Sequence, residues 1–74
     1  MTEKELNKII SQKYSEETAN QFANEQKGYF ADENCWDNYC QAVIELMNKN
    51  YSEDEFIDYA FVLPRKHGRM LVDD

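Results

Sequence analysis

The side chains that could carry out metal or thiol chemistry are few, because the 74 residues include two cysteines and one histidine. A structural zinc site needs four ligands, and a catalytic one needs three and a water. Cys35 and Cys40 are five positions apart in a segment of helical periodicity, so their side chains point about 140° apart and their α-carbons lie about 8–9 Å apart. This geometry suits neither a shared metal nor a disulfide. We therefore expect no metal and no cofactor, and we expect one or both cysteines to be small core residues.

A set of residues for acid–base or nucleophilic catalysis is not evident either. His67 lies in a basic stretch and has no evident group to orient its ring. Two glycines cannot form a glycine-rich phosphate loop. Asp54, Glu55 and Asp58 share one predicted helix face, which leaves an enzyme built from carboxylates open, but acids on a solvated helix face are common. The sequence therefore favours a protein that is not an enzyme.

The strongest chemical feature of the chain is its negative charge. Fifteen acidic residues face eight basic ones, which gives a net charge of −7. Arg65, Lys66 and Arg69 fall within five residues, so the remainder carries five lysines against fifteen acids, a net of −10. Such a surface repels nucleic acid and anionic membranes, and it attracts basic partners.

The acids of two predicted helices are candidates for such a binding surface. Asp37 and Glu45 belong to an i, i+4 row on the central helix, away from its apolar stripe, and Asp54, Glu55 and Asp58 cluster on the next helix. Glu16 and Glu17 open the second helix, and if the two hairpins pack side by side, all these acids merge into one acidic face. We predict that the five carboxylates of the central helix and the next helix bind a basic protein surface of the kind found on proteins that bind nucleic acid. A surface that only keeps the protein soluble is the plainer alternative.

Two further functions stay open. A small DNA-associated regulator would use a helix-turn-helix-like corner with Arg65, Lys66 and Arg69, although the surrounding acids would repel a duplex. A self-associating structural module, such as a homodimer, would add burial to a core that is small at this length. The basic cluster also has a structural interpretation, in which it neutralises the acidic body or contacts the negative ends of helices.

Capping residues mark the expected helix starts. Thr2 with Glu5, and Ser52 with Glu55, form capping boxes that satisfy unpaired backbone N–H groups, and Ser15 is a preferred N-cap. Together with apolar periodicity, these signals predict helices over residues 3–13, 16–27 and 33–49, and a fourth that begins at 53 and is stopped by the proline at 64.

The third of these helices carries the clearest apolar pattern. Its apolar residues recur at helical spacing over three turns, so we expect this helix to be the spine of the core with its carboxylates in water. These residues are Trp36, Tyr39, Cys40, Val43, Ile44 and Met47. Before it, Gly28 is predicted to end the second helix in the left-handed conformation, with Tyr29 folding back on Ala23.

The tripeptide Tyr-Ser-Glu occurs twice, at 14–16 and at 51–53, which is a shift of 37 residues. Each copy leads into a helix N-cap, so each predicts a tight corner between two helices. We expect Tyr14 to pack on Ala19 in the first corner, and Tyr51 to pack on Phe56 in the second. Either the chain is an internal repeat of two helical hairpins, or the same capping solution occurs twice.

Together these elements predict an all-α protein of four short helices arranged as two helical hairpins. Residues 1–63 would form the helical domain, and residues 64–74 a C-terminal arm or, with 61–63, a small β-hairpin. The arm is favoured because two isolated strands are marginally stable. The chain has no apolar signal region and no apolar run near the roughly 20 residues of a membrane span, so we expect a cytoplasmic protein with reduced thiols.

In general character the chain is similar to small phage-encoded inhibitors, including anti-CRISPR and antirestriction proteins. The resemblance rests on the size, acidity, helical pattern and aromatic content of the whole chain, and on no motif, so no functional residue is carried over. It implies a non-enzymatic inhibitor that binds a nucleic-acid-handling protein.

Overall fold

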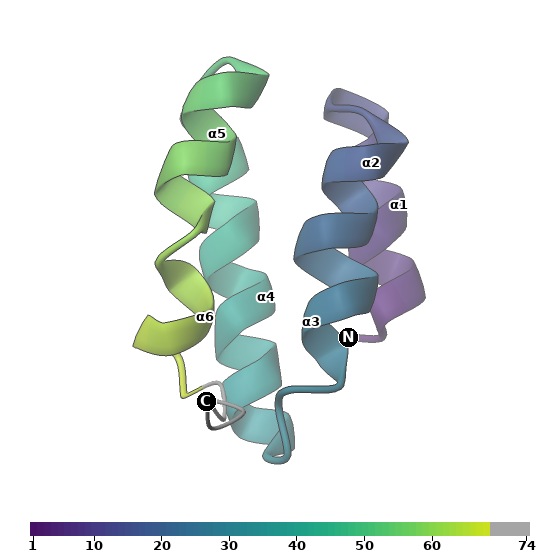
Figure 1. Cartoon of the computed structure of the whole chain (residues 1–74), viewed down its shortest axis with the longest axis vertical. Helices are drawn as coiled ribbons and strands as arrows, with labels where there is room; N and C mark the ends of the chain where they lie inside the picture. The colour runs from purple at the N-terminus through teal and green to yellow at the C-terminus, as the bar shows by residue number, and fades with distance from the viewer. Residues whose placement is uncertain (69–74) are drawn as a thin grey trace.

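The computed structural model describes residues 1–68, in which every regular element is helical, so the all-α prediction is confirmed for this range. Figure 1 shows α1 beside a second helical stretch, and α4 with α5 and α6 along its other side. The second stretch is continuous but changes type, because a five-residue π-helical segment, η1, separates α2 from α3. The elements are α1 (Glu3–Lys13), α2 (Glu16–Ala19), η1 (Asn20–Asn24), α3 (Glu25–Lys27), α4 (Glu33–Met47), α5 (Glu53–Ala60) and α6 (Leu63–Lys66).

The capping residues place three helix starts where the sequence predicts them. Thr2 with Glu5, and Ser52 with Glu55, form complete capping boxes, and the hydroxyl of Ser15 accepts a backbone N–H of α2. The first helix has the predicted bounds, and the second stretch covers residues 16–27 as predicted. The third helix ends two residues earlier than predicted, and Asn50 follows with a left-handed φ of 59° that turns the chain toward α5.

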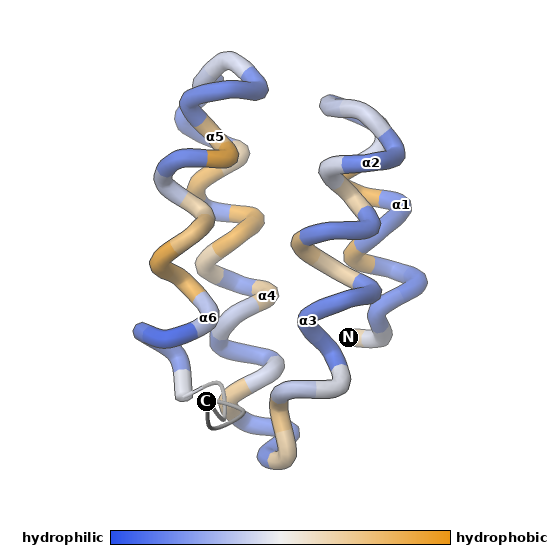
Figure 2. The backbone as a smooth tube through the Cα atoms, viewed as in Figure 1, coloured by the Kyte–Doolittle hydropathy of each residue, from blue (hydrophilic) through white to orange (hydrophobic). Residues whose placement is uncertain are grey.

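The core is organised around α4, as the apolar pattern predicts. Trp36, Tyr39 and Val43 are fully buried, and the indole Nε1–H of Trp36 donates to the carbonyl of Met1 at 2.6 Å. Figure 2 shows the hydrophobic positions of α1, α4 and α5 recurring between polar ones, as in amphipathic helices. The buried apolar side chains are Leu6, Ile10, Ala19, Phe22, Ala23, Phe30, Trp36, Tyr39, Cys40, Val43, Met47, Phe56 and Ala60.

The prediction of a left-handed Gly28 is wrong. Its φ is −66°, within the right-handed helical region. The chain leaves α3 through i→i+3 backbone hydrogen bonds donated by Tyr29 and Phe30. This tighter exit carries Phe30 into the core, where its ring stacks on Tyr39 with centroids 5.1 Å apart. The second helical stretch therefore ends with Phe30 entering the core, and not with a left-handed glycine.

The prediction that Pro64 ends the helical segment is also wrong. α5 ends at Ala60, residues 61–62 form a turn, and Pro64 lies in the first turn of α6, where its missing N–H has no intrahelical acceptor to lose. The predicted boundary after residue 63 therefore falls inside α6. The first strand of the alternative β-hairpin, at 61–63, does not form. Its second strand, at 69–72, and most of the C-terminal arm lie outside the described residues.

The two Tyr-Ser-Glu corners lie against each other. The hydroxyl of Tyr14 donates to the carbonyl of Tyr51 at 2.8 Å. The ring of Tyr14 stacks on Phe56 with centroids 4.7 Å apart. Phe56 therefore packs against the tyrosine of the first corner. Tyr51 packs its own ring against Tyr59, also at 4.7 Å. Tyr14 therefore joins the two corners, whereas Tyr51 packs on Tyr59 of the helix that its own corner leads into.

Glu53 completes this joint by capping a helix in the other half of the chain. Its carboxylate accepts the backbone N–H of Ser15 at 2.8 Å and the hydroxyl of Thr18 at 2.9 Å. In the second corner, Glu55 caps its own helix, but the equivalent position of the first corner is Thr18, which has no carboxylate. In return, the ammonium of Lys13 donates to the last carbonyl of α4 at 2.6 Å, where the helix dipole is negative.

We predict that Glu53→Gln lowers the melting temperature near neutral pH, with an effect that fades in acid. The backbone N–H of Ser15, followed by the side chains of Ser15 and Thr18, lowers the pKa of Glu53 below its ordinary 4.5. Because the folded pKa is the lower one, the carboxylate stabilises the fold above pH 4.5, and this contribution is lost as the pH falls through the folded value. Circular dichroism melts at several pH values, with Asp54→Asn as a control in the same turn, test this. An equal loss at every pH would contradict it.

A second prediction concerns the two phenylalanines of the α5 region. Phe56 is fully buried and Phe61 is 61% exposed. Phe56→Ala should cost about 3–5 kcal/mol of unfolding free energy, which is close to the whole stability of many small domains. Phe61→Ala should lower it by about 1 kcal/mol at most, because Phe61 is mostly exposed and contributes one ring contact, to Phe22. Urea denaturation followed at 222 nm measures both, and similar losses in the two variants would show that the burial pattern is different.

Candidate functional site

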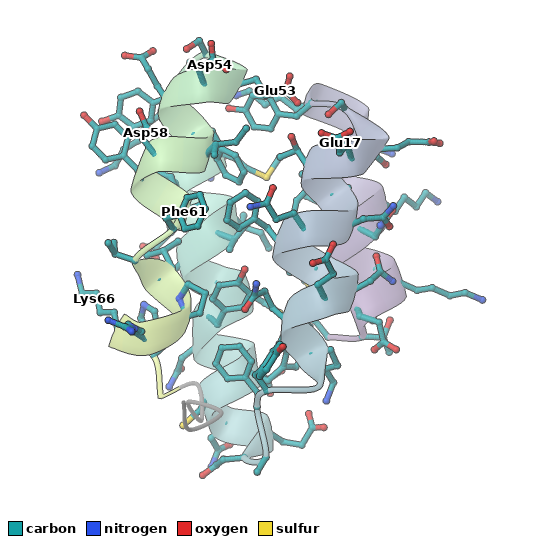
Figure 3. The ribbon with its side chains drawn as sticks, in the orientation of Figure 1. Glu17, Glu53, Asp54, Asp58, Phe61 and Lys66 are labelled. Atoms are coloured by element: carbon teal, nitrogen blue, oxygen red, sulfur yellow. The ribbon has the colours of Figure 1, made fainter. Side chains whose placement is uncertain are left out.

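The five predicted binding carboxylates fall into two groups. Asp37 and Glu45 line a groove of about 690 Å³ between α4 and α6. Asp54, Glu55 and Asp58 lie on the first two turns of α5. Figure 3 shows Asp54 and Asp58 on the outer side of α5, whereas Glu53 is turned toward α2.

The groove between α4 and α6 has mixed charge. Its acids, Asp37 and Glu45, share the walls with Lys49, Lys66 and His67. The carboxylate of Asp37 also accepts from the N-terminal ammonium at 3.1 Å, and this contact raises the pKa of that amino group. Because cations offset both acids within the same groove, α4 does not present a purely negative surface there.

The carboxylates of α5 differ in how far they are engaged. Glu55 accepts from both the backbone N–H and the hydroxyl of Ser52 at 3.1 Å, so it serves the helix start. The exposed carboxylates of Asp54 and Asp58 make no hydrogen bond or ion pair with any group of residues 1–68. These two acids are therefore available to an external cation.

The basic residues of the alternative prediction lie at the end of α6. Arg65 and Lys66 are exposed, and Arg69 falls outside the described residues. Lys66 borders the groove that contains Asp37 and Glu45. This placement is what we expect if the basic cluster partly offsets the acidic body.

Sequence analysis missed two residues beside the free acids. Phe61 and Val62 both fall in the alternative strand at 61–63, and neither was predicted to lie on a binding surface. Each is 61% exposed. The sequence does indicate that some apolar residues of this helix are exposed. Five of them lie between positions 56 and 61, and they cover more than one face of a short helix.

The thiol of Cys40 is poorly suited to nucleophilic chemistry. Cys40 is buried, and burial raises its pKa to about 11, which confirms the prediction that at least one cysteine belongs to the core. Cys35 is half-buried close to Gly68, and both thiols are free. Within residues 1–68, no three His, Cys, Asp or Glu side chains come together as potential metal ligands.

No family model, curated protein or solved structure matches this chain. The functional assignment therefore depends on the geometry of residues 1–68. None of the helices in that range has the length and apolar character needed to cross a bilayer.

We predict that the two thiols react at very different rates in the native protein. Raising a thiol pKa from 9.0 to about 11 lowers the thiolate fraction at pH 8 roughly a hundredfold, and burial slows the approach of the reagent further. Cys35→Ala, which retains Cys40 alone, should therefore react with a chromogenic disulfide reagent far more slowly than the wild type. Unfolding in urea should restore the reaction. Rapid native labelling of Cys35→Ala would contradict the buried position of Cys40.

Proposed function

We propose that the chain is a non-enzymatic binding protein that docks the exposed acids of α5 on a basic surface of a nucleic-acid-handling protein. Asp54 and Asp58 carry the proposal, because their carboxylates are exposed and have no partner within residues 1–68. Glu55 lies beside them, while the charges of Asp37 and Glu45 on α4 are partly offset by the cations of their groove. The net charge of −7 favours encounter with cationic surfaces.

The geometry of α5 suits recognition of a surface that binds phosphates. Residues four apart on a helix are neighbours, about 5–6 Å between their Cβ atoms, so Asp54 and Asp58 present two closely spaced negative charges. A capping box and the bonds from Glu53 to the first corner hold the start of this helix, so the backbone that carries the two charges is in place before binding. Preorganisation reduces the entropy lost on association. The partner's Lys and Arg residues, which normally bind phosphates, would instead form ion pairs with Asp54 and Asp58.

The arrangement as two helical hairpins belongs to the same proposal. α1 runs along α2 and η1, and α4 runs along α5 (Figure 1), while a 37-residue shift relates the two corners. At this shift, Asp54 and Asp58 correspond to Glu17 and Gln21. Asp54 and Asp58 would therefore belong to the second hairpin, and the first hairpin would hold the start of α5 through its bonds with Glu53.

An inhibitor of the phage type is the role that this binding mode would suit. A small acidic protein that covers a phosphate-binding surface competes with the nucleic acid for it. The DNA-associated regulator has less support, because Lys66 shares its groove with Asp37 and Glu45, which would repel phosphates.

We predict that Asp54→Lys with Asp58→Lys abolishes capture of the partner. Reversing both acids replaces attraction by repulsion, and capture by the wild type should itself weaken as salt is added. Affinity capture from a host lysate, read by mass spectrometry, should recover basic nucleic-acid-handling proteins with the wild type and not with this variant.

The matched control is Glu17→Lys with Glu25→Lys. It makes the same change in net charge on exposed residues of other helices, and Glu17 occupies the second position of α2 as Asp54 does in α5. The control should retain capture, with folding of both variants checked by circular dichroism. Equal capture by the wild type and the α5 variant would remove the proposal.

A further inference from the structure

The largest exposed apolar side chains of residues 1–68 gather where α5 meets α6. Tyr59 is 51% exposed, and Phe61 and Val62 are each 61% exposed. Only Met1 joins them among the large hydrophobic residues exposed in this range. Single exposed apolar residues are ordinary, but Phe61 and Val62 are adjacent and each is mostly exposed, which suggests a contact surface, while Tyr59 packs on Tyr51.

The local fold explains why this patch stays outside the core. Phe56 and Ala60 are the buried residues of α5, and Phe61 and Val62 form the exposed turn that follows Ala60. Pro64 is buried at the start of α6 and brings the chain back onto the body. Phe61 reaches the edge of the ring of Phe22, with centroids 6.0 Å apart, yet remains mostly exposed.

The exposed apolar residues follow the free acids along the chain. Asp54 and Asp58 are four residues apart within α5, so they lie on one face of that helix. Phe61 and Val62 form the turn after α5, and Lys66 is the last residue of α6. Figure 3 shows this order along α5 and α6, with Asp54 and Asp58 at one end, Phe61 in the middle and Lys66 at the other end. We call these five residues the α5–α6 strip.

The charge order of the strip selects the occupant. Cations of a partner are attracted to Asp54 and Asp58 and repelled by Lys66, so they must lie beyond one side of the apolar contact. A second copy is a poorer occupant. The exposed parts of Tyr59, Phe61 and Val62 amount to roughly 300 Å², well below the roughly 800 Å² per partner of a stable specific interface, and each copy carries −7.

We infer that the α5–α6 strip is the docking surface for an amphipathic partner segment whose apolar side chains cover Phe61 and Val62 and whose Lys or Arg residues reach Asp54 and Asp58. This inference rests on the proposed function and adds an apolar anchor to it. Exposed apolar anchors supply affinity at the centre of interfaces, while charges at the rim set the encounter rate and orientation.

A defined peptide tests the inference. The probe is a fluorescein-labelled helix of about 18 residues with leucine at positions i, i+3, i+4 and i+7. Its other positions are lysine in one half of the helix and glutamine in the other half, and its control has the same composition in scrambled order. Fluorescence anisotropy should show binding of the amphipathic peptide to the wild type and at least about tenfold weaker binding of the scrambled one. Phe61→Ser with Val62→Ser, and separately Asp54→Asn with Asp58→Asn, should each weaken binding about tenfold or more. Glu17→Gln with Glu25→Gln should leave it unchanged.

The outcomes separate the inference from the proposed function. Loss of binding in the aspartate variant alone would keep the acidic surface and overturn the apolar anchor. Loss in the phenylalanine–valine variant alone, or in neither, would overturn both. Equal binding of the scrambled peptide would also overturn the anchor, since only charge would then be recognised. Sedimentation equilibrium of the wild type should give a monomer, and a dimer abolished by Phe61→Ser would assign the strip to a second copy instead.

Discussion

The hydrogen bonds between the two Tyr-Ser-Glu corners hold the start of α5 against the first corner, and the placement of the candidate binding residues on α5 depends on them. Glu53 caps Ser15 in the other half of the chain, and the hydroxyl of Tyr14 in turn binds the carbonyl of Tyr51. A short helix such as α5 is marginal by itself in water. These exchanges, together with burial of Phe56, hold it against the body with its outer face in a fixed direction.

Adjacent acids in α5 have different roles because successive residues on a helix point about 100° apart. Glu53 faces the first corner, Glu55 faces its own N-cap, and Asp54 lies between them in water. All three favour the positive start of the helix, so the unpaired Asp54 does not oppose folding of α5. The chain can therefore keep an unpaired acid at this position without an internal cation, which would otherwise compete with a partner.

Local signals determined what could be predicted from the sequence. The pairs Thr2–Glu5 and Ser52–Glu55 act within one turn, so they revealed helix starts directly, and the spacing of Trp36 with Val43 revealed the core face of α4. The joint between the corners was not predictable in the same way, because Tyr14 had an acceptable partner nearby and its actual partner, Phe56, lies far along the chain. Tertiary contacts decide between local options of similar quality.

The candidate site shows the same limit. Helical spacing correctly grouped Asp54 with Asp58, but no local pattern could show that the carboxylate of Asp37 binds the N-terminal ammonium or that cations share its groove. The exposure of Phe61 is an intermediate case, since it depends on how many apolar residues one short helix can bury. α5 has Phe56 and Ala60 inside, and the turn before Pro64 directs the next two residues outward. An apolar residue that the fold leaves exposed beside two unpaired acids lowers stability little when truncated, which makes Phe61 more informative about binding than about folding.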